Sequence, residues 1–160
     1  MPNKDNSNLY LGRAAQLLVV SEFLLHKWNA AIPEVDTGDD VFVVKDRIGE
    51  FKRIQVKAVH GITTKYGYSA KFTLPYTQAI TPITPELVYF LYVRLSKEWG
   101  RYLIIERSEL HKYLDPNTIG TYNQKKDTVQ LYFAFHPLKI ICKKVDFKIH
   151  ESNWSLFPEL

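Results

Sequence analysis

Two neighbouring runs of the sequence carry polar residues whose types and spacing could hydrolyse a phosphodiester. Asp40 directly precedes the apolar run 41–45, and Gln55 and Lys57 lie within the run 50–59. Both runs contain the β-branched and aromatic residues typical of strands, and the four residues between them have turn chemistry. The runs are therefore predicted to form an antiparallel hairpin that brings the polar residues together.

The turn predicts the register of this hairpin. If it closes symmetrically about residues 47 and 48, Asp40 faces Gln55. Directly opposed residues of an antiparallel pair lie roughly 4.5–5.5 Å apart. Because side chains alternate between the two faces of a strand, Lys57 shares a face with Gln55. An acid, a carboxamide and an ammonium group are thus expected to converge on one point.

These groups suit metal-assisted phosphodiester hydrolysis, which needs a cation, an activated water and positive charge near the phosphate. Magnesium prefers hard oxygen ligands. The Asp40 carboxylate would supply one, and the Gln55 side-chain carbonyl or the Val56 backbone carbonyl would supply another. Lys57 would orient the water or stabilise the phosphate. The alternative is that Asp40 merely ends a turn and that Lys57 merely extends from a strand edge.

The hairpin and the segment before it resemble the PD-(D/E)XK, or restriction-endonuclease-like, nuclease superfamily. The resemblance covers roughly residues 8–74 and is greatest for small members with Gln in place of the first acidic residue of the triplet. It rests on Gly12–Gln16 in a predicted helix, on Ile32–Asp40 and on Ile54–Lys57. The implied fold is α/β, with a core of helix, three-stranded antiparallel meander, helix and strand, and a central mixed sheet.

By position, the resemblance implies that Asp40 is the central metal ligand, Gln55 the second ligand and Lys57 the catalytic lysine. Relatives usually carry Glu at the position of Gln16, which would here supply a polar contact from the helix. Because Gln16 and Gln55 are amides, Asp40 is the only clear carboxylate among the positions aligned with the family's site. Mg²⁺, or Mn²⁺ in its place, is therefore expected to bind weakly until substrate phosphate oxygens complete its shell.

Patterning predicts the remaining elements. A helix that begins at Ser7 or Asn8 is expected to end near Ala30, because Pro33 cannot donate in a helix interior. Residues 68–74 are predicted to form a third strand after the hairpin. Later strands are expected at 87–95, 101–106, 129–135 and 138–142, and short helices around 77–81 and 108–114.

Length and composition predict one soluble domain spanning residues 1–160. The hydrophobic share of 46% and the charged share of 24% are typical of globular proteins. The single cysteine, Cys142, excludes an internal disulfide and fits a reducing compartment. The sequence shows neither a secretory signal nor the run of roughly 20 apolar residues that crosses a membrane. A cytoplasmic location is therefore predicted.

The formal net charge of +4 is compatible with a polyanionic partner, and DNA is the expected one. A chain of this size has little room for both a cleavage site and two-sided DNA recognition, so a homodimer or higher homo-oligomer is predicted. The residues expected to contact nucleic acid are Lys52, Arg53, Lys65, Tyr66 and Lys71.

The expected function is that of a magnesium-dependent endonuclease acting on DNA, of the restriction, homing or junction-resolving type. A second possibility is a catalytically impaired DNA-binding or partner-binding protein on the same fold. A third is a structural domain whose polar cluster satisfies itself. The five histidines show no pair at i, i+4, so the sequence does not predict a zinc site.

Overall fold

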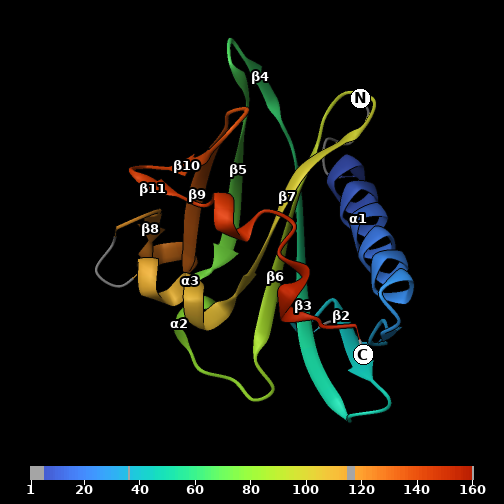
Figure 1. Cartoon of the computed structure of the whole chain (residues 1–160). Helices are drawn as coiled ribbons and strands as arrows, with labels where there is room; N and C mark the ends of the chain where they lie inside the picture. The colour runs from blue at the N-terminus through green and yellow to red at the C-terminus, as the bar shows by residue number, and fades with distance from the viewer. Residues whose placement is uncertain (1–5, 36, 115–117, 160) are drawn as a thin grey trace.

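The computed structural model describes residues 6–35, 37–114 and 118–159, which form three layers (Figure 1). A helix packs on one face of a five-stranded sheet, and a second sheet packs on the other face. The helices are α1 (Asn6–Leu25), α2 (Tyr76–Ile80) and α3 (Arg107–Leu114), with short 3₁₀ turns at Gln124–Lys126, Lys148–His150 and Trp154–Leu156.

The first sheet has the strand order β1-β2-β3-β6-β7. Its strands β3 and β6 run parallel, whereas its other neighbours are antiparallel, so the sheet is mixed. The strands are β1 (Asn29–Ala31), β2 (Val41–Lys45), β3 (Glu50–His60), β6 (Leu87–Arg94) and β7 (Trp99–Glu106). A mixed α/β fold with a mixed central sheet is therefore confirmed.

The second sheet has the order β11-β10-β9-β5-β4 and is antiparallel throughout, with β8 paired to β9. Its strands are β4 (Ile62–Thr64), β5 (Gly67–Pro75), β8 (Thr121–Asn123), β9 (Thr128–Phe135), β10 (Ile140–Cys142) and β11 (Val145–Asp146).

Two hydrophobic cores lie on opposite faces of the first sheet. The core under α1 contains Ala15, Val19 and Phe23 of the helix, packed against alternate residues of the strands such as Ile54 and Phe90. The other core fills the space between the two sheets. Because successive strand residues point to opposite faces, β6 supplies both cores and is buried along seven of its eight residues.

The predicted register of the β2–β3 hairpin is confirmed. Val41 pairs with Ile54 and Lys45 with Glu50, and the Asp40 amide donates to the Ile54 carbonyl at 2.9 Å. The strand bounds match the predicted run 41–45, and β3 extends one residue further than expected, to His60.

Two other predictions about elements are wrong. The first helix ends at Leu25 and not near Ala30, because Lys27 adopts a left-handed φ of 61° and the Trp28 amide donates to the Phe23 carbonyl at 2.9 Å. Residues 29–31 then pair with β2 as a strand.

Residues 68–74 do form a strand, but it belongs to the second sheet, where β5 pairs with β4 and β9. The antiparallel meander of the first sheet is instead β1-β2-β3, and the other edge of β3 pairs with the parallel strand β6. No helix in the described part of the chain combines the length and apolar character that crossing a membrane requires.

Candidate functional site

A cavity of about 680 Å³ opens beside β3, at the point where β2 begins. β2 pairs with residues 50–54 of β3 only, so among described residues the same edge of β3 has no neighbouring strand from Gln55 onward. The N-terminal half of α1, the segment before β2 and the start of α2 surround this open edge. The cavity lining includes all five residues predicted for the catalytic and metal site, which we term the cavity cluster: Gln16, Asp40, Gln55, Val56 and Lys57.

Asp40 continues the β2–β3 ladder with its side chain. Its carboxylate oxygen Oδ2 accepts a hydrogen bond from the Val56 backbone amide at 2.7 Å and a second, short one from Gln55 Nε2. The N–H and C=O of one strand residue point to the same edge, so the Val56 carbonyl also faces this side of β3. A carboxylate and a backbone carbonyl therefore share one edge of the cavity.

Gln16 joins α1 to this arrangement. Its Nε2 donates to the Asp40 backbone carbonyl at 2.6 Å, while its Oε1 accepts from Arg13 Nη1 at 2.6 Å. Gln16 thus holds the main chain of Asp40, and in this geometry its own oxygen is directed to Arg13. Arg13 lies one helical turn away and lines the same cavity, where its exposed guanidinium adds positive charge.

A chain of hydrogen bonds fixes the orientation of Gln55. The Tyr89 hydroxyl donates to Gln78 Oε1 at 3.1 Å, and Gln78 Nε2 donates to the Gly38 carbonyl at 2.9 Å and to Gln55 Oε1 at 3.5 Å. Burial raises the pKa of Tyr89 above its usual range, so the hydroxyl stays a donor. The Gln55 amide therefore directs its nitrogen to Asp40. For Gln55 and Asp40 to bind one cation together, this amide would have to rotate so that its oxygen faces Asp40.

Gly38 allows this chain to form. Its φ of 104° lies in the region that favours glycine, and a Cβ at this position would meet Gln78 Nε2 at 3.0 Å. The glycine thus serves both the turn before Asp40 and the close approach of α2.

Lys57 is half-buried at the cavity wall. Its side chain shares a face with Gln55, as predicted, because the two residues are separated by two positions on one strand. Among the residues that the structure describes, the Lys57 ammonium makes no hydrogen bond or ion pair. Lys57 therefore gives the cavity a cation that is available to a bound anion.

The sequence offers Asp36 and Asp39 as the nearest further carboxylates. Asp36 lies outside the described residues. Asp39 is buried and forms an ion pair with Arg53, with 2.7 Å between Oδ2 and Nη1. Glu34 is exposed and lines the cavity, and its role was not predicted. The described part of the chain contains no group of three or more His, Cys, Asp or Glu residues that could hold a metal ion.

The oxygen donors at this edge suit magnesium. Mg²⁺ binds through one or two carboxylates and keeps several waters, which substrate phosphate oxygens can replace. The Asp40 carboxylate and the Val56 carbonyl are hard oxygens at one edge, and Glu34 can supply a second carboxylate from the cavity rim. These donors fit a weakly held, hydrated Mg²⁺.

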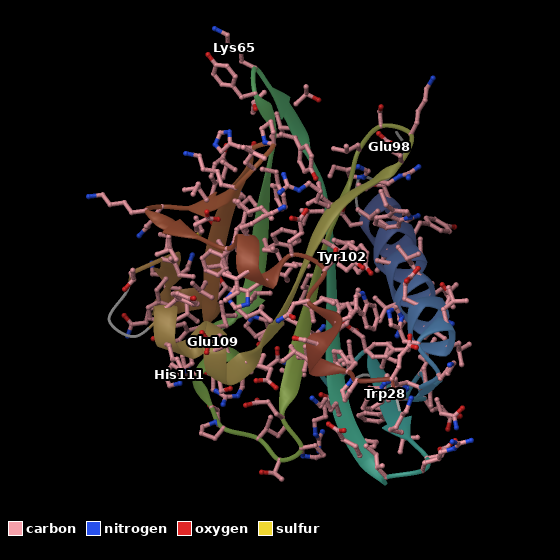
Figure 2. All side chains as sticks on the ribbon, in the orientation of Figure 1. Trp28, Lys65, Glu98, Tyr102, Glu109 and His111 are labelled. Atoms are coloured by element: carbon pink, nitrogen blue, oxygen red, sulfur yellow. The ribbon has the colours of Figure 1, made fainter. Side chains whose placement is uncertain are left out.

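The residues predicted to contact nucleic acid are not brought together. Lys52 Nζ donates to the Leu156 carbonyl at 2.7 Å and lies 5.0 Å from the centre of the Phe157 ring, so it stabilises the C-terminal segment. Arg53 is paired with Asp39, as described above. Lys65 lies at the tip of the β4–β5 hairpin (Figure 2), with its ammonium 5.1 Å from the centre of the Tyr66 ring.

Lys71 is exposed on β5, on the side of the second sheet that faces away from the core. Sequence reasoning missed Arg13, Glu34 and Gln78 of the cavity lining, and also Tyr89, which is buried behind Gln78. Arg13 lies inside the motif that carried the resemblance and could have been found there. Gln78 and Tyr89 belong to no motif, because only the packing of α2 and β6 against β3 brings them to the site.

No protein-family model and no curated protein sequence matches this chain. Among solved structures, the chain is similar to that of a bacterial homing endonuclease, I-Ssp6803I, with a TM-score of 0.55 and 16% sequence identity. The alignment covers 94% of this chain and 92% of that chain. At this identity, the similarity shows a shared fold across almost the whole of both proteins.

Proposed function

We propose that this protein is a magnesium-dependent endonuclease that hydrolyses DNA phosphodiester bonds on a restriction-endonuclease-like core. The observation that carries the proposal is the convergence of Asp40, Gln55 and Lys57 on one open cavity, delivered by β2 and β3 in the predicted register. The shared fold with a protein described as a homing endonuclease supports the same reading.

The metal would be held by Asp40 and the Val56 carbonyl, with Gln55 or Glu34 as a further ligand. When bound, Mg²⁺ neutralises phosphate charge and lowers the pKa of a coordinated water. The Lys57 ammonium stabilises negative charge on the phosphate or orients the attacking water. Gln16 and Gln78 act as positioning residues, because one holds the Asp40 main chain and the other holds the Gln55 amide.

Supercoiled plasmid with Mg²⁺ or Mn²⁺ provides the test. The wild-type protein is expected to convert it to open-circular and linear forms, and Asp40→Asn is expected to lower the rate at least about 100-fold. Asn keeps an oxygen that can accept from the Val56 amide, so the fold should persist. Glu98→Gln, at the exposed β6–β7 turn, is the matched control and should cleave like wild type.

A second candidate function is DNA binding without cleavage. The observation that favours it is the Gln55 amide, which presents nitrogen and not oxygen to Asp40. Retardation of DNA with no cleavage in Mg²⁺, Mn²⁺ or Ca²⁺ would support this function. Absence of both cleavage and DNA binding at low salt would exclude the two together, because electrostatic binding is strongest there.

A further inference from the structure

Helix α1 has two apolar faces on opposite sides. Ala15, Val19 and Phe23 are fully buried against the first sheet. Tyr10 and Leu17 point to the opposite side, since residues advance by about 100° around a helix. These two side chains are 77% and 50% exposed. An amphipathic surface helix carries mainly polar residues on its outer face, whereas α1, at the edge of the molecule in Figure 1, carries large apolar residues there.

The outer face has the spacing of a helix–helix seam. Its large and small residues alternate at steps of four and three, which is the pattern of a and d positions in a coiled coil. Leu24 is 55% exposed and Leu25 is 73% exposed beside it. We call this surface the α1 seam, and it consists of Tyr10, Ala14, Leu17, Ser21 and Leu24.

We propose that the α1 seam binds the α1 seam of a second copy of this chain, with the two helices antiparallel. A two-fold interface uses the same surface on both subunits and must be self-complementary. In an antiparallel pair, a large d residue of one helix faces a small a residue of the other, so Leu17 packs over Ala14 or Ser21 of the partner copy. A parallel pair would place large against large and leave voids between small residues.

The area and charge of the seam fit this occupant. A fully exposed large side chain presents roughly 150–200 Å², and the exposed fractions of Tyr10, Leu17 and Leu24, with the flanking Leu25, then give roughly 400–500 Å² per chain. Two copies bury about 800–1,000 Å², near the ~1,000 Å² that a specific interface requires, before the small residues Ala14 and Ser21 are counted. No seam residue is charged, so the two-fold axis brings no like charges together.

Sedimentation equilibrium of the full chain tests the proposal. The wild-type protein is expected to sediment as a dimer at micromolar concentration, and Leu17→Glu as a monomer, with the dimer dissociation constant raised at least about 100-fold by the buried carboxylate. Leu138→Glu is the matched control, since Leu138 is 86% exposed on the β9–β10 turn and lies outside the seam. A monomeric wild-type protein, or a Leu17→Glu variant that stays dimeric and folded, would overturn the proposal.

Orientation is tested by oxidising Tyr10→Cys. The native Cys142 is buried and does not compete. When antiparallel seams overlap along their length, the two copies of residue 10 lie on different helical turns, outside the roughly 7 Å Cα separation that a disulfide tolerates. The variant should therefore stay unlinked, and an interchain disulfide would contradict the antiparallel arrangement. The dimer does not depend on cleavage, so either proposal can fail without the other.

Discussion

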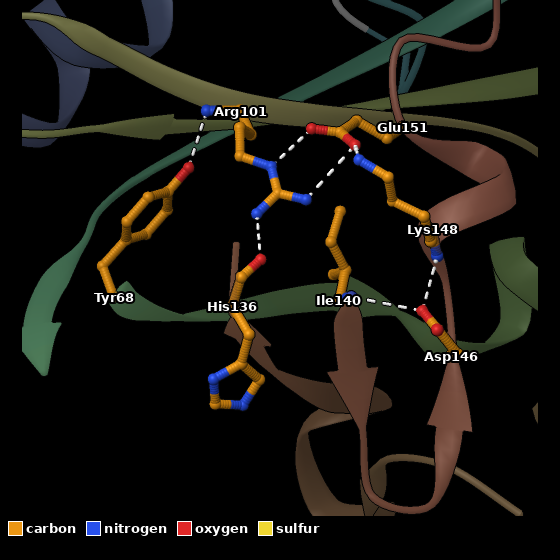
Figure 3. A network of polar contacts seen from close by, with 7 residues as sticks. All are labelled: Tyr68, Arg101, His136, Ile140, Asp146, Lys148 and Glu151. Carbon is orange, nitrogen blue, oxygen red and sulfur yellow. Dashed lines mark hydrogen bonds and ion pairs between the residues drawn. The ribbon is translucent and has the colours of Figure 1, made fainter. Parts of the chain in front are cut away.

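The cavity cluster and the network around Arg101, which Figure 3 shows, use the same kinds of side chain but complete their interactions differently. In the network, Arg101 donates to both carboxylate oxygens of Glu151 and to the His136 carbonyl, and its backbone amide donates to the Tyr68 hydroxyl at 2.7 Å. Lys148 adds a second ion pair to Glu151. In the cavity cluster, Lys57 has no such partner among the described residues.

The difference indicates what each region contributes. The Arg101 network joins β5, β7, the β9–β10 turn and the segment after β11, so its charges stabilise the packing of the two sheets. The cavity cluster lies beside an open strand edge, where its cation and its ordered amides face a space large enough for a ligand. Charge removal should therefore cost stability in the first region and activity in the second.

The largest effect is expected from Lys57→Met. Loss of a charge that acts on the reacting phosphate should lower the plasmid cleavage rate about 10²–10³-fold. The thermal midpoint should stay within the change produced by about 0.5 kcal/mol, because no described partner is left unpaired. Calorimetry beside the cleavage assay measures both. A variant that cleaves at the wild-type rate would show that Lys57 takes no part in the chemistry.

Glu151→Gln should lower the stability of the fold and leave the cleavage rate unchanged. Removing the carboxylate leaves the part-buried Arg101 guanidinium without its counter-charge, which should lower the free energy of unfolding by about 1.5–3 kcal/mol. Urea denaturation at pH 7 measures this loss, and Glu159→Gln, near the exposed C-terminal end, is the control. The cleavage rate per folded molecule should not change. A lowered rate in fully folded protein would show that the network also serves the cavity.

Tyr89→Phe tests the hydrogen bonds that orient the Gln55 amide. The substitution removes the donor to Gln78 Oε1, so Gln78 can rotate and no longer directs the Gln55 nitrogen to Asp40. A stability loss of about 1 kcal/mol is expected from the lost hydrogen bond, with a change in the Mg²⁺ concentration needed for half-maximal cleavage. Tyr122→Phe, on exposed β8, is the control. An unchanged magnesium dependence would separate Gln78 from the metal site.

The smallest effect is a pH dependence confined to the Arg101 network. The hydrogen bond from Arg101 holds the pKa of Glu151 below its ordinary value of 4.5. The folded state therefore binds this proton less readily than the unfolded state does, so the stabilisation is present above about pH 4.5 and is lost as the pH falls through the folded-state pKa. Wild type and Glu151→Gln should thus differ in stability at pH 7 and converge in acid. A constant difference down to pH 3 would contradict this assignment.

The hairpin was the most predictable part of the protein. A short turn and the two-residue alternation of strands are local properties, so they predicted that Asp40 precedes β2 opposite Gln55 and that Lys57 shares its face. The end of α1 was less predictable, because the Pro33 signal lies well beyond the left-handed residue Lys27 that ends the helix.

Pairing between distant segments was not predictable. The sequence indicated a strand at residues 68–74 but not its sheet, since strand patterning identifies a strand without naming its neighbour. The parallel pairing of β3 with β6 could not be predicted from the sequence, because no tight turn connects these two strands. For the same reason Gln78 and Tyr89 could not be assigned to the site, and the fold separates the residues that were predicted to contact nucleic acid.

By itself, the sequence determined which groups the hairpin carries and in what register, because short-range chain geometry controls both. The tertiary structure decided the rest: that an open cavity lies beside β3, that Gln55 directs its nitrogen to Asp40, and that the outer face of α1 is left uncovered. Each of these depends on which distant surfaces pack together, and that outcome is a property of the whole core and not of any one segment.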